Sequence, residues 1–369
     1  MTAAALSDDD PAVRLTAARE QFHAEVTYLN TATLGLPPLA SLEALDAAQQ
    51  QWRTGTADAA AYDASLEAAR ATYAGLVGVD PGSVAVGSQV SVFAGLVAAS
   101  LPDGSEVLTA TGDFTSILFP FHAQASRRVT VREVPLERIA AAVTARTRLV
   151  SVSAVQSRDG RLVDLDALEQ ACAATGTRVL LDTTQAVGWL PVDASRFAYT
   201  VGGGYKWLLA PRGAAYFTIA PDLFDEVVPH TAGWYAGEDR WSSIYGGPLR
   251  LAADARRFDV SPAWQSWVGA APALALLAGI GSGVLHEHGV GLANRFRAGV
   301  GEPPGASAIV TVAVGDGAAD AMRAAEVVGA MRAGRLRLSF HLYTSEEDVD
   351  FAVEVLRRHV LPDVPAPGR

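Results

Sequence analysis

The chain has 369 residues, of which 50% are hydrophobic and 19% are charged, and its 29 basic and 40 acidic residues give a formal net charge of −11. This composition is typical of a soluble globular protein with more than one domain, and the acidic balance argues against binding to nucleic acid. The single cysteine, Cys172, excludes an internal disulfide and a cysteine-rich metal site and favours a reducing, cytoplasmic location. The apolar runs are too short to span a membrane, and residues 1–19 lack the pattern of a signal peptide.

In chain order, the pattern first predicts a helix over residues 11–27 and then a long helical stretch over residues 39–77 with a break near Thr54-Gly55. Short apolar runs then alternate with helical segments and predict strands at 83–86, 106–108, 129–131, 149–154, 179–181, 198–201 and 214–219. Because these runs are apolar on both faces, we expect an α/β fold with a mostly parallel sheet covered by helices.

The composition changes near residues 246–261, after which Pro262 opens another helical region and the tail from Ile309 holds short strands and two helices. We therefore predict a large domain of residues 28–255 and a smaller α+β domain made of residues 1–27 and 256–369.

Polar residues and glycines follow the predicted strands, at the edge where ligands bind in open α/β sheets. Gly87-Ser88-Gln89 precedes a helix, so its backbone N–H groups could hold a phosphate, or Ser88 could simply cap the helix. Phe114 could stack on a flat ring or pack in the core. Gln156 could bind a ring hydroxyl or satisfy loop backbone groups.

Asp182 ends the most apolar strand, and Lys206 follows the next strand after three glycines that allow close backbone approach. A buried carboxylate needs a cationic partner, which a protonated pyridine nitrogen would supply, although Asp182 could instead cap a helix. A lysine with apolar neighbours has a lowered pKa and is a better nucleophile. Together the two groups could hold both ends of one aromatic aldehyde cofactor. The glycine run lacks the Gly-Lys-Ser/Thr ending of a P-loop, which disfavours a nucleotide-binding enzyme.

Near the C-terminus, alternation places Arg335, Arg337 and Ser339 on one face of a strand. An inward arginine could bind a carboxylate through two hydrogen bonds, whereas a surface ion pair is the commoner role of arginine.

These motifs together resemble the class V aminotransferase family of pyridoxal 5′-phosphate (PLP)-dependent fold-type I enzymes, in particular the branch of isopenicillin N epimerase and cysteine desulfurase. The resemblance covers nearly the whole chain. It rests on Tyr28-Leu-Asn30-Thr31-Ala32-Thr-Leu-Gly35, Asp113-Phe114, Val155-Gln156, Asp182-Thr-Thr-Gln185, Tyr205-Lys206-Trp207, Arg257-Phe258-Asp259-Val-Ser261-Pro262 and Arg332-Ala-Gly-Arg335-Leu-Arg337-Leu-Ser339.

The resemblance implies that Lys206 forms a Schiff base with PLP and that Asp182 pairs with the pyridinium nitrogen. The other implied cofactor contacts are phosphate binding by Ser88 and Gln89, ring stacking by Phe114, ring-hydroxyl contacts by Gln156 and Gln185, and contacts from Tyr205 and, across a dimer interface, Ser261. Arg337 would bind the substrate α-carboxylate and Asn30 would also contact substrate. No metal is implied.

Three features depart from the family pattern. Gly203-Gly204-Tyr205-Lys206 replaces the Ser-x-His-Lys of desulfurases, so two familiar cofactor contacts are missing or replaced. Gly87-Ser88-Gln89 replaces Gly-Thr/Ala-Thr in the phosphate loop, and residues 299–314 are shorter than the family's small domain.

The expected function is that of a homodimeric PLP enzyme acting on an amino acid or an amine-bearing metabolite. Transamination and C–S or β-elimination are the favoured reactions, with Lys206 as the general base, and epimerisation or racemisation is the alternative. A non-catalytic PLP-fold scaffold or regulatory protein would require the loss of Lys206 or Asp182, and both are present. A sulfur-relay desulfurase needs a mobile thiolate, whereas Cys172 is expected to be a packed side chain on a helix.

Overall fold

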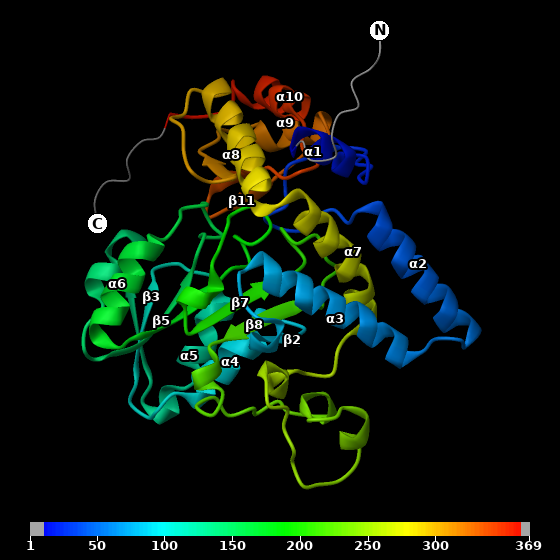
Figure 1. Cartoon of the computed structure of the whole chain (residues 1–369). Helices are drawn as coiled ribbons and strands as arrows, with labels where there is room; N and C mark the ends of the chain where they lie inside the picture. The colour runs from blue at the N-terminus through cyan, green and yellow to red at the C-terminus, as the bar shows by residue number, and fades with distance from the viewer. Residues whose placement is uncertain (1–10, 363–369) are drawn as a thin grey trace.

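A seven-stranded sheet forms the centre of the computed structural model, which describes residues 11–362 (Figure 1). The strand order is β2-β8-β7-β6-β5-β3-β4, and every neighbouring pair is parallel except the two that involve β8. The strands are β2 (Val84–Gly87), β3 (Glu106–Ala110), β4 (Thr130–Val134), β5 (Thr147–Ser153), β6 (Arg178–Asp182), β7 (Tyr199–Gly203) and β8 (Ala215–Ile219). The prediction of a mostly parallel α/β sheet is therefore confirmed, with a strand at each of the seven predicted places.

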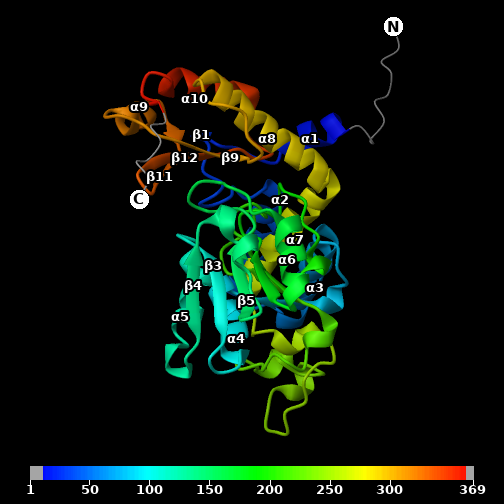
Figure 2. The ribbon, with the colours of Figure 1, turned by 90° about the vertical axis from the view of Figure 1, so that its left-hand side faces the viewer.

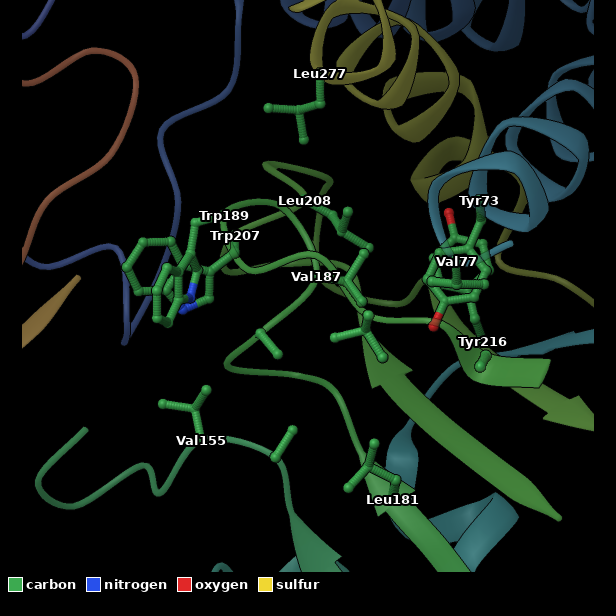
Figure 3. Packing of buried hydrophobic residues seen from close by; sticks show 14 of the residues in the cluster. Tyr73, Val77, Val155, Leu181, Val187, Trp189, Trp207, Leu208, Tyr216 and Leu277 are labelled. Carbon is green, nitrogen blue, oxygen red and sulfur yellow. The ribbon is translucent and has the colours of Figure 1, made fainter. Parts of the chain in front are cut away.

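Alternate residues of the central strands enter two different hydrophobic cores, which explains why the sequence is apolar on both faces. On β6, Leu180 packs in the core that contains α4 (Val90–Ser100) and α5 (Phe119–His122). The next residue, Leu181, packs in the core that contains α3 (Ala59–Leu76) and α6 (Leu165–Thr175). Figure 3 shows part of this second core, where Leu181 lies below Val187 and the rings of Tyr73 and Tyr216 stack.

Three long helices cover one side of the sheet. The break predicted near Gly55 is present: α2 (Leu39–Thr54) ends there because Gly55 adopts a left-handed φ of 73°, and α3 begins after Asp58, which caps it. α7 (Trp264–Ile280) lies beside α2 and α3 (Figure 1), and Ser41 on α2 donates a hydrogen bond to the Gly269 carbonyl on α7 at 2.7 Å. The packing thus places α7 with the large sheet.

A second unit stands at one end of the large sheet in both views (Figures 1 and 2). Its antiparallel sheet has the order β11-β12-β9, and β1 pairs in parallel with β10. Its elements are β1 (Thr27–Tyr28), α8 (Ser282–Gly299), β9 (Ile309–Val312), α9 (Ala318–Ala324), β10 (Val327–Val328), β11 (Ala330–Arg332), β12 (Arg335–Ser339) and α10 (Glu346–Leu356). The β1–β10 pairing joins an N-terminal segment to a C-terminal segment of the chain. The predicted division into domains at residue 255 stays a prediction.

The first helix is shorter than predicted. α1 (Pro11–Arg19) ends eight residues before the predicted end at residue 27 because tertiary contacts hold the following segment in another conformation. Arg19 donates to the carbonyl of Leu342, the Gln21 carbonyl accepts from Leu39, and the Phe22 ring packs on Tyr343. Propensity alone cannot reveal such distant partners.

Within residues 11–362, no single helix is long and apolar enough to cross a membrane, and α7 with α8 reaches that length and composition only as a pair bent by 85°. In the same residues, no group of three or more His, Cys, Asp or Glu side chains could hold a metal ion.

Candidate active site

Lys206 lies in a tight turn after β7, and its side chain is only 5% exposed. Neighbouring segments press closely on this turn. A Cβ atom on Gly35 would lie 2.1 Å from the Lys206 carbonyl oxygen, and one on Gly188 would lie 2.2 Å from that of Trp207. The Nε2 atom of His341, which follows β12, is 2.8 Å from the same Trp207 oxygen. The turn is therefore fixed from three separate parts of the chain.

We expect Gly35→Ala to distort this turn, because the new methyl group would overlap backbone that cannot move aside. The variant should lose roughly 1–3 kcal/mol of unfolding free energy and should bind cofactor less well. Gly75→Ala is the matched control: a Cβ at this exposed position in α3 meets nothing within 4 Å, so stability should rise by about 1 kcal/mol. Urea unfolding measures both. Equal stability of the two variants would contradict the close packing around Lys206.

Asp182, at the end of β6, lies on the neighbouring strand and lines the same pocket as Lys206. Its side chain is 5% exposed and accepts a hydrogen bond from the Thr184 backbone N–H at 2.8 Å. Burial raises the pKa of Asp182 to about 6, although Thr184 and Lys206 oppose the shift. Burial also lowers the pKa of Lys206 to about 8, against the pull of Asp182. Burial therefore raises the free energy of the charged form of each group, and a bound ligand that pairs with the charge would lower it.

The sequence contains one lysine and 28 arginines, a signal that the motif analysis did not use. Where a fixed positive charge suffices, this chain uses arginine. Arginine cannot lose its proton in a protein, whereas a buried lysine becomes a neutral nucleophile near physiological pH. The retention of lysine at position 206 alone thus points to chemistry at the amine.

The pocket around these two residues encloses about 600 Å³, a volume that includes the open solvent at its mouth. Seven predicted site residues line it: Ser88, Gln89, Phe114, Asp182, Gln185, Tyr205 and Lys206. Ser88 to Ser91 form its wall at the N-terminus of α4, where unpaired backbone N–H groups favour an anion.

Two aromatic rings flank the lysine amine. The Nζ atom of Lys206 lies 5.2 Å from the ring centroid of Phe114 and 5.6 Å from that of Tyr205. Phe114 is 42% exposed and lines the pocket, so it is not the core residue that the alternative interpretation required. Its ring is free to stack on a flat ligand.

Four predicted site residues are not in the pocket wall. Gln156 is buried and donates to the Oδ2 atom of Asp113 at 3.0 Å. Arg337 is also buried and donates to Ser157 and to the Thr33 hydroxyl, the latter at 2.8 Å. Asn30 forms a backbone bridge with Ser339, and its Oδ1 atom is buried without a partner among the described residues. Ser261 is exposed and does not line this pocket.

Ser157 connects the pocket with Arg337. Its hydroxyl accepts from Gln185 Nε2 at 2.9 Å and from Arg337 Nη1 at 3.3 Å, and Ser157 itself lines the pocket. The Gln185 side chain also donates to the Ala32 carbonyl and accepts from Trp207 Nε1, so its amide is fixed on both sides. Arg337 therefore reaches the pocket through one shared hydroxyl group.

Two residues of the site were missed as functional candidates. Asp113 accepts from the Ser153 hydroxyl at 2.6 Å and from Gln156, and thereby organises the strand ends beneath Phe114. Arg212 lines the pocket with its guanidinium carbon 4.9 Å from the Tyr205 ring centroid. A cation six residues after the lysine was the available sequence signal for Arg212. The partners of Asp113 could not be read from sequence because they lie 40 and 43 residues away, at and just beyond the end of β5.

These residues fit a flat pyridine aldehyde that carries a phosphate. The neutral form of a buried amine can attach to the aldehyde, and a buried carboxylate without an ion pair can accept the ring N–H. The helix N-terminus and Arg212 suit the phosphate, and Phe114 suits the ring face.

Known proteins share the sequence pattern and the fold of this chain. The family model Aminotransferase class-V matches residues 47–313. An uncharacterized aminotransferase of Bacillus subtilis, YcbU, is 28% identical over 78% of this chain and 82% of its own length. Isopenicillin N epimerase of Streptomyces clavuligerus is 28% identical over 79% of this chain and 84% of its own. The solved structure of the cystine C-S lyase C-DES with its product cysteine persulfide superimposes with a TM-score of 0.81 at 23% identity, covering 91% of this chain and 98% of that one.

The family match spans well over half of the chain, and the fold agrees with that of the solved structure. Class V aminotransferases use PLP, and the pocket holds a lysine and a carboxylate suited to that cofactor. The chain therefore belongs to the class V aminotransferase family of PLP-dependent enzymes.

Proposed function

We propose that this enzyme acts on an amino acid or an amine-bearing metabolite and breaks one bond at its Cα, either in transamination or in C–S or β-elimination. The observation that carries the proposal is the buried pair of Lys206 and Asp182, placed by two neighbouring parallel strands in one pocket. Its relatives include an uncharacterized aminotransferase and an epimerase, and a C-S lyase has a similar fold, so epimerisation is the second candidate.

When bound, PLP supplies an electron sink for the charge that develops at Cα. Lys206 would hold the cofactor covalently and, once released by the substrate amine, would move the proton at Cα. Asp182 would keep a proton on the ring nitrogen through a charge-assisted hydrogen bond. The α4 N-terminus with Ser88 and Gln89 would bind phosphate, beside Tyr205 and Arg212.

Substrate placement would rest on residues behind the pocket wall. Arg337 would bind the α-carboxylate after exchanging its bonds with Ser157 and Thr33 for the ligand. Gln185 would face the ring hydroxyl, whereas Gln156 would need to exchange its hydrogen bond with Asp113 to do so.

A panel of amino acids, each tested with and without a 2-oxo acid as amino acceptor, tests the reaction class, with keto acid, ammonia, sulfide and inverted amino acid measured for each substrate. Keto acid without ammonia identifies transamination, ammonia with or without sulfide identifies elimination, and inversion identifies epimerisation. Lys206→Ala protein serves as the blank. A cofactor-loaded enzyme that yields none of these products across the panel would contradict the proposal.

Cys172 is expected to be dispensable. It lies on α6, is 4% exposed within the hydrophobic core, and burial raises the pKa of its thiol to about 11. A relay of sulfur needs an accessible thiolate. Cys172→Ala should therefore keep turnover within a factor of about three, with the loss limited to local packing. Loss of activity in a folded, cofactor-loaded Cys172→Ala protein would restore the sulfur-relay interpretation.

We propose that the active form is a cytoplasmic homodimer with the cofactor near the interface. Ser261 is exposed and lies outside the pocket of its own chain, as expected for a residue that serves a partner. The segment around residues 240–250 projects away from the sheet (Figures 1 and 2) and carries large exposed side chains: Trp241, Ile244, Tyr245 and Leu249. Tyr245 is 91% exposed, which is unusual for a large aromatic ring unless a second surface covers it.

Light scattering should give twice the chain mass of 38.5 kDa, and Tyr245→Ser with Leu249→Ser should weaken association. Trp52→Ser on α2, which removes another exposed ring, is the control. A fully active monomer would contradict the dimer.

A further inference from the structure

Two arginines meet at one neutral oxygen beside the proposed substrate site. Arg337 Nη2 donates to the Thr33 hydroxyl at 2.8 Å, and Arg332 Nη2 donates to the same oxygen at 3.3 Å. Arg337 lies within β12 and is 1% exposed, whereas Arg332 ends β11 and is exposed. Arg332 also donates a hydrogen bond from Nη1 to the carbonyl of its neighbour Met331.

The position of Arg332 is fixed by a two-residue turn. Arg332 pairs with Arg335 across the β11–β12 hairpin, and the two residues between them, Ala333 and Gly334, both have positive φ angles, 48° and 79°. Such turns follow the natural twist of paired strands and hold them in a defined register. Arg332 is therefore presented from a rigid hairpin.

Among residues 11–362, no carboxylate balances the positive charge of this pair. Neither guanidinium forms an ion pair with a carboxylate among residues 11–362, and the Nε atom of Arg337 is buried without a partner there. Burial lowers the pKa of Arg337 to about 10, and the charge of Arg332 adds to the decrease. Both arginines also contribute to the low pKa of Lys206.

Another buried arginine of this chain has the opposite environment. Arg70 is 2% exposed, pairs with Asp259 at 2.7 Å and with Glu67 at 3.0 Å, and its pKa is raised because these attractions exceed the effect of burial. A buried cation is normally compensated in this way. Arg337 has no such partner among residues 11–362, so its buried charge would be balanced by an anion from outside the protein, and the exposed Arg332 lies at the same Thr33 oxygen.

One α-carboxylate can balance only one of the two charges. We propose that Arg332 binds a second carboxylate of the substrate, so that the preferred substrate is an amino acid with an acidic side chain. This inference rests on the proposed function, in which Arg337 binds the α-carboxylate. Arg337 would then hold the inner end of the substrate, while the exposed Arg332 recognises the acidic end and distinguishes it from its neutral isosteres.

Binding of small acids to the PLP-loaded enzyme tests the second anion site without turnover. Succinate and glutarate are compared with butyrate and valerate by calorimetry and by the change in cofactor absorbance. The dicarboxylates should bind roughly tenfold to a hundredfold more tightly, as expected for one additional charge-assisted contact. R332Q should remove this difference and R332K should keep part of it. R323Q, which alters another exposed arginine on α9, should leave the difference unchanged.

The amino-acid panel extends the test, with aspartate and glutamate compared with asparagine and glutamine. A wild-type enzyme that loads PLP but binds acidic and neutral ligands equally, or a preference that survives in R332Q, would overturn the role of Arg332 alone. A wild-type protein that binds no PLP would overturn the proposed function and this inference together.

Discussion

Lys206→Ala is expected to abolish covalent cofactor attachment and to reduce turnover by at least about a thousandfold, because one group supplies both the nucleophile and the base. No other lysine in the chain can substitute for it. PLP should then bind only reversibly, held by the phosphate and ring contacts. Loss of the visible absorbance of the lysine-bound cofactor, together with single-turnover kinetics, measures both effects.

The pH dependence of attachment follows from the pKa of Lys206. Burial lowers this pKa to about 8, and only the neutral amine is nucleophilic, so the attachment rate should rise with pH and level off above about 8. Arg332→Gln removes a positive charge that disfavours the protonated amine, so the midpoint of the attachment rate against pH should move to higher pH in this variant.

Normal turnover by Lys206→Ala protein would contradict the role assigned to Lys206 as nucleophile and base.

Asp182→Ala is expected to weaken PLP binding by roughly tenfold to a hundredfold, because it removes a buried charge-assisted hydrogen bond worth about 1.5–3 kcal/mol. Turnover should fall further, since an unprotonated ring withdraws electrons poorly. Asp46→Ala, at an exposed position on α2, is the control and should change neither PLP affinity nor turnover. Equilibrium dialysis of PLP and steady-state kinetics separate the two effects.

Asp182 should also set the acidic limit of PLP binding. Its pKa in the free protein is raised to about 6 by burial, and the bound ring requires the ionised carboxylate. PLP affinity should therefore be full above about pH 6 and should decline as the pH falls below it. Asp182→Asn should remove this decline. An unchanged pH profile in Asp182→Asn would show that another group binds the ring nitrogen.

Much of the fold was predictable because parallel strands that are buried on both faces leave a clear mark in sequence. β2, β6 and β7 are apolar runs, and the residues that follow them line the pocket. Asp182 and Lys206 could be paired from sequence for this reason: their strands are neighbours, and the carboxyl ends of parallel strands meet.

What could not be predicted depends on partners from distant segments. Gln156 turns to Asp113, and Arg337 is engaged by Ser157 and Thr33 behind the pocket wall. The early end of α1 and the packing of α7 against α2 likewise follow from contacts between distant segments. Local periodicity carries no information about such contacts.

Borohydride reduction of the PLP-loaded enzyme, followed by peptide mapping, tests the central claim most directly. Reduction makes the lysine–cofactor bond permanent, and the chain offers one lysine side chain and the terminal amine as possible sites. We predict one reduced cofactor per chain, located on the peptide that contains Tyr205-Lys206-Trp207. A cofactor-loaded protein with no adduct at Lys206, or with the adduct on the terminal amine, would contradict the claim.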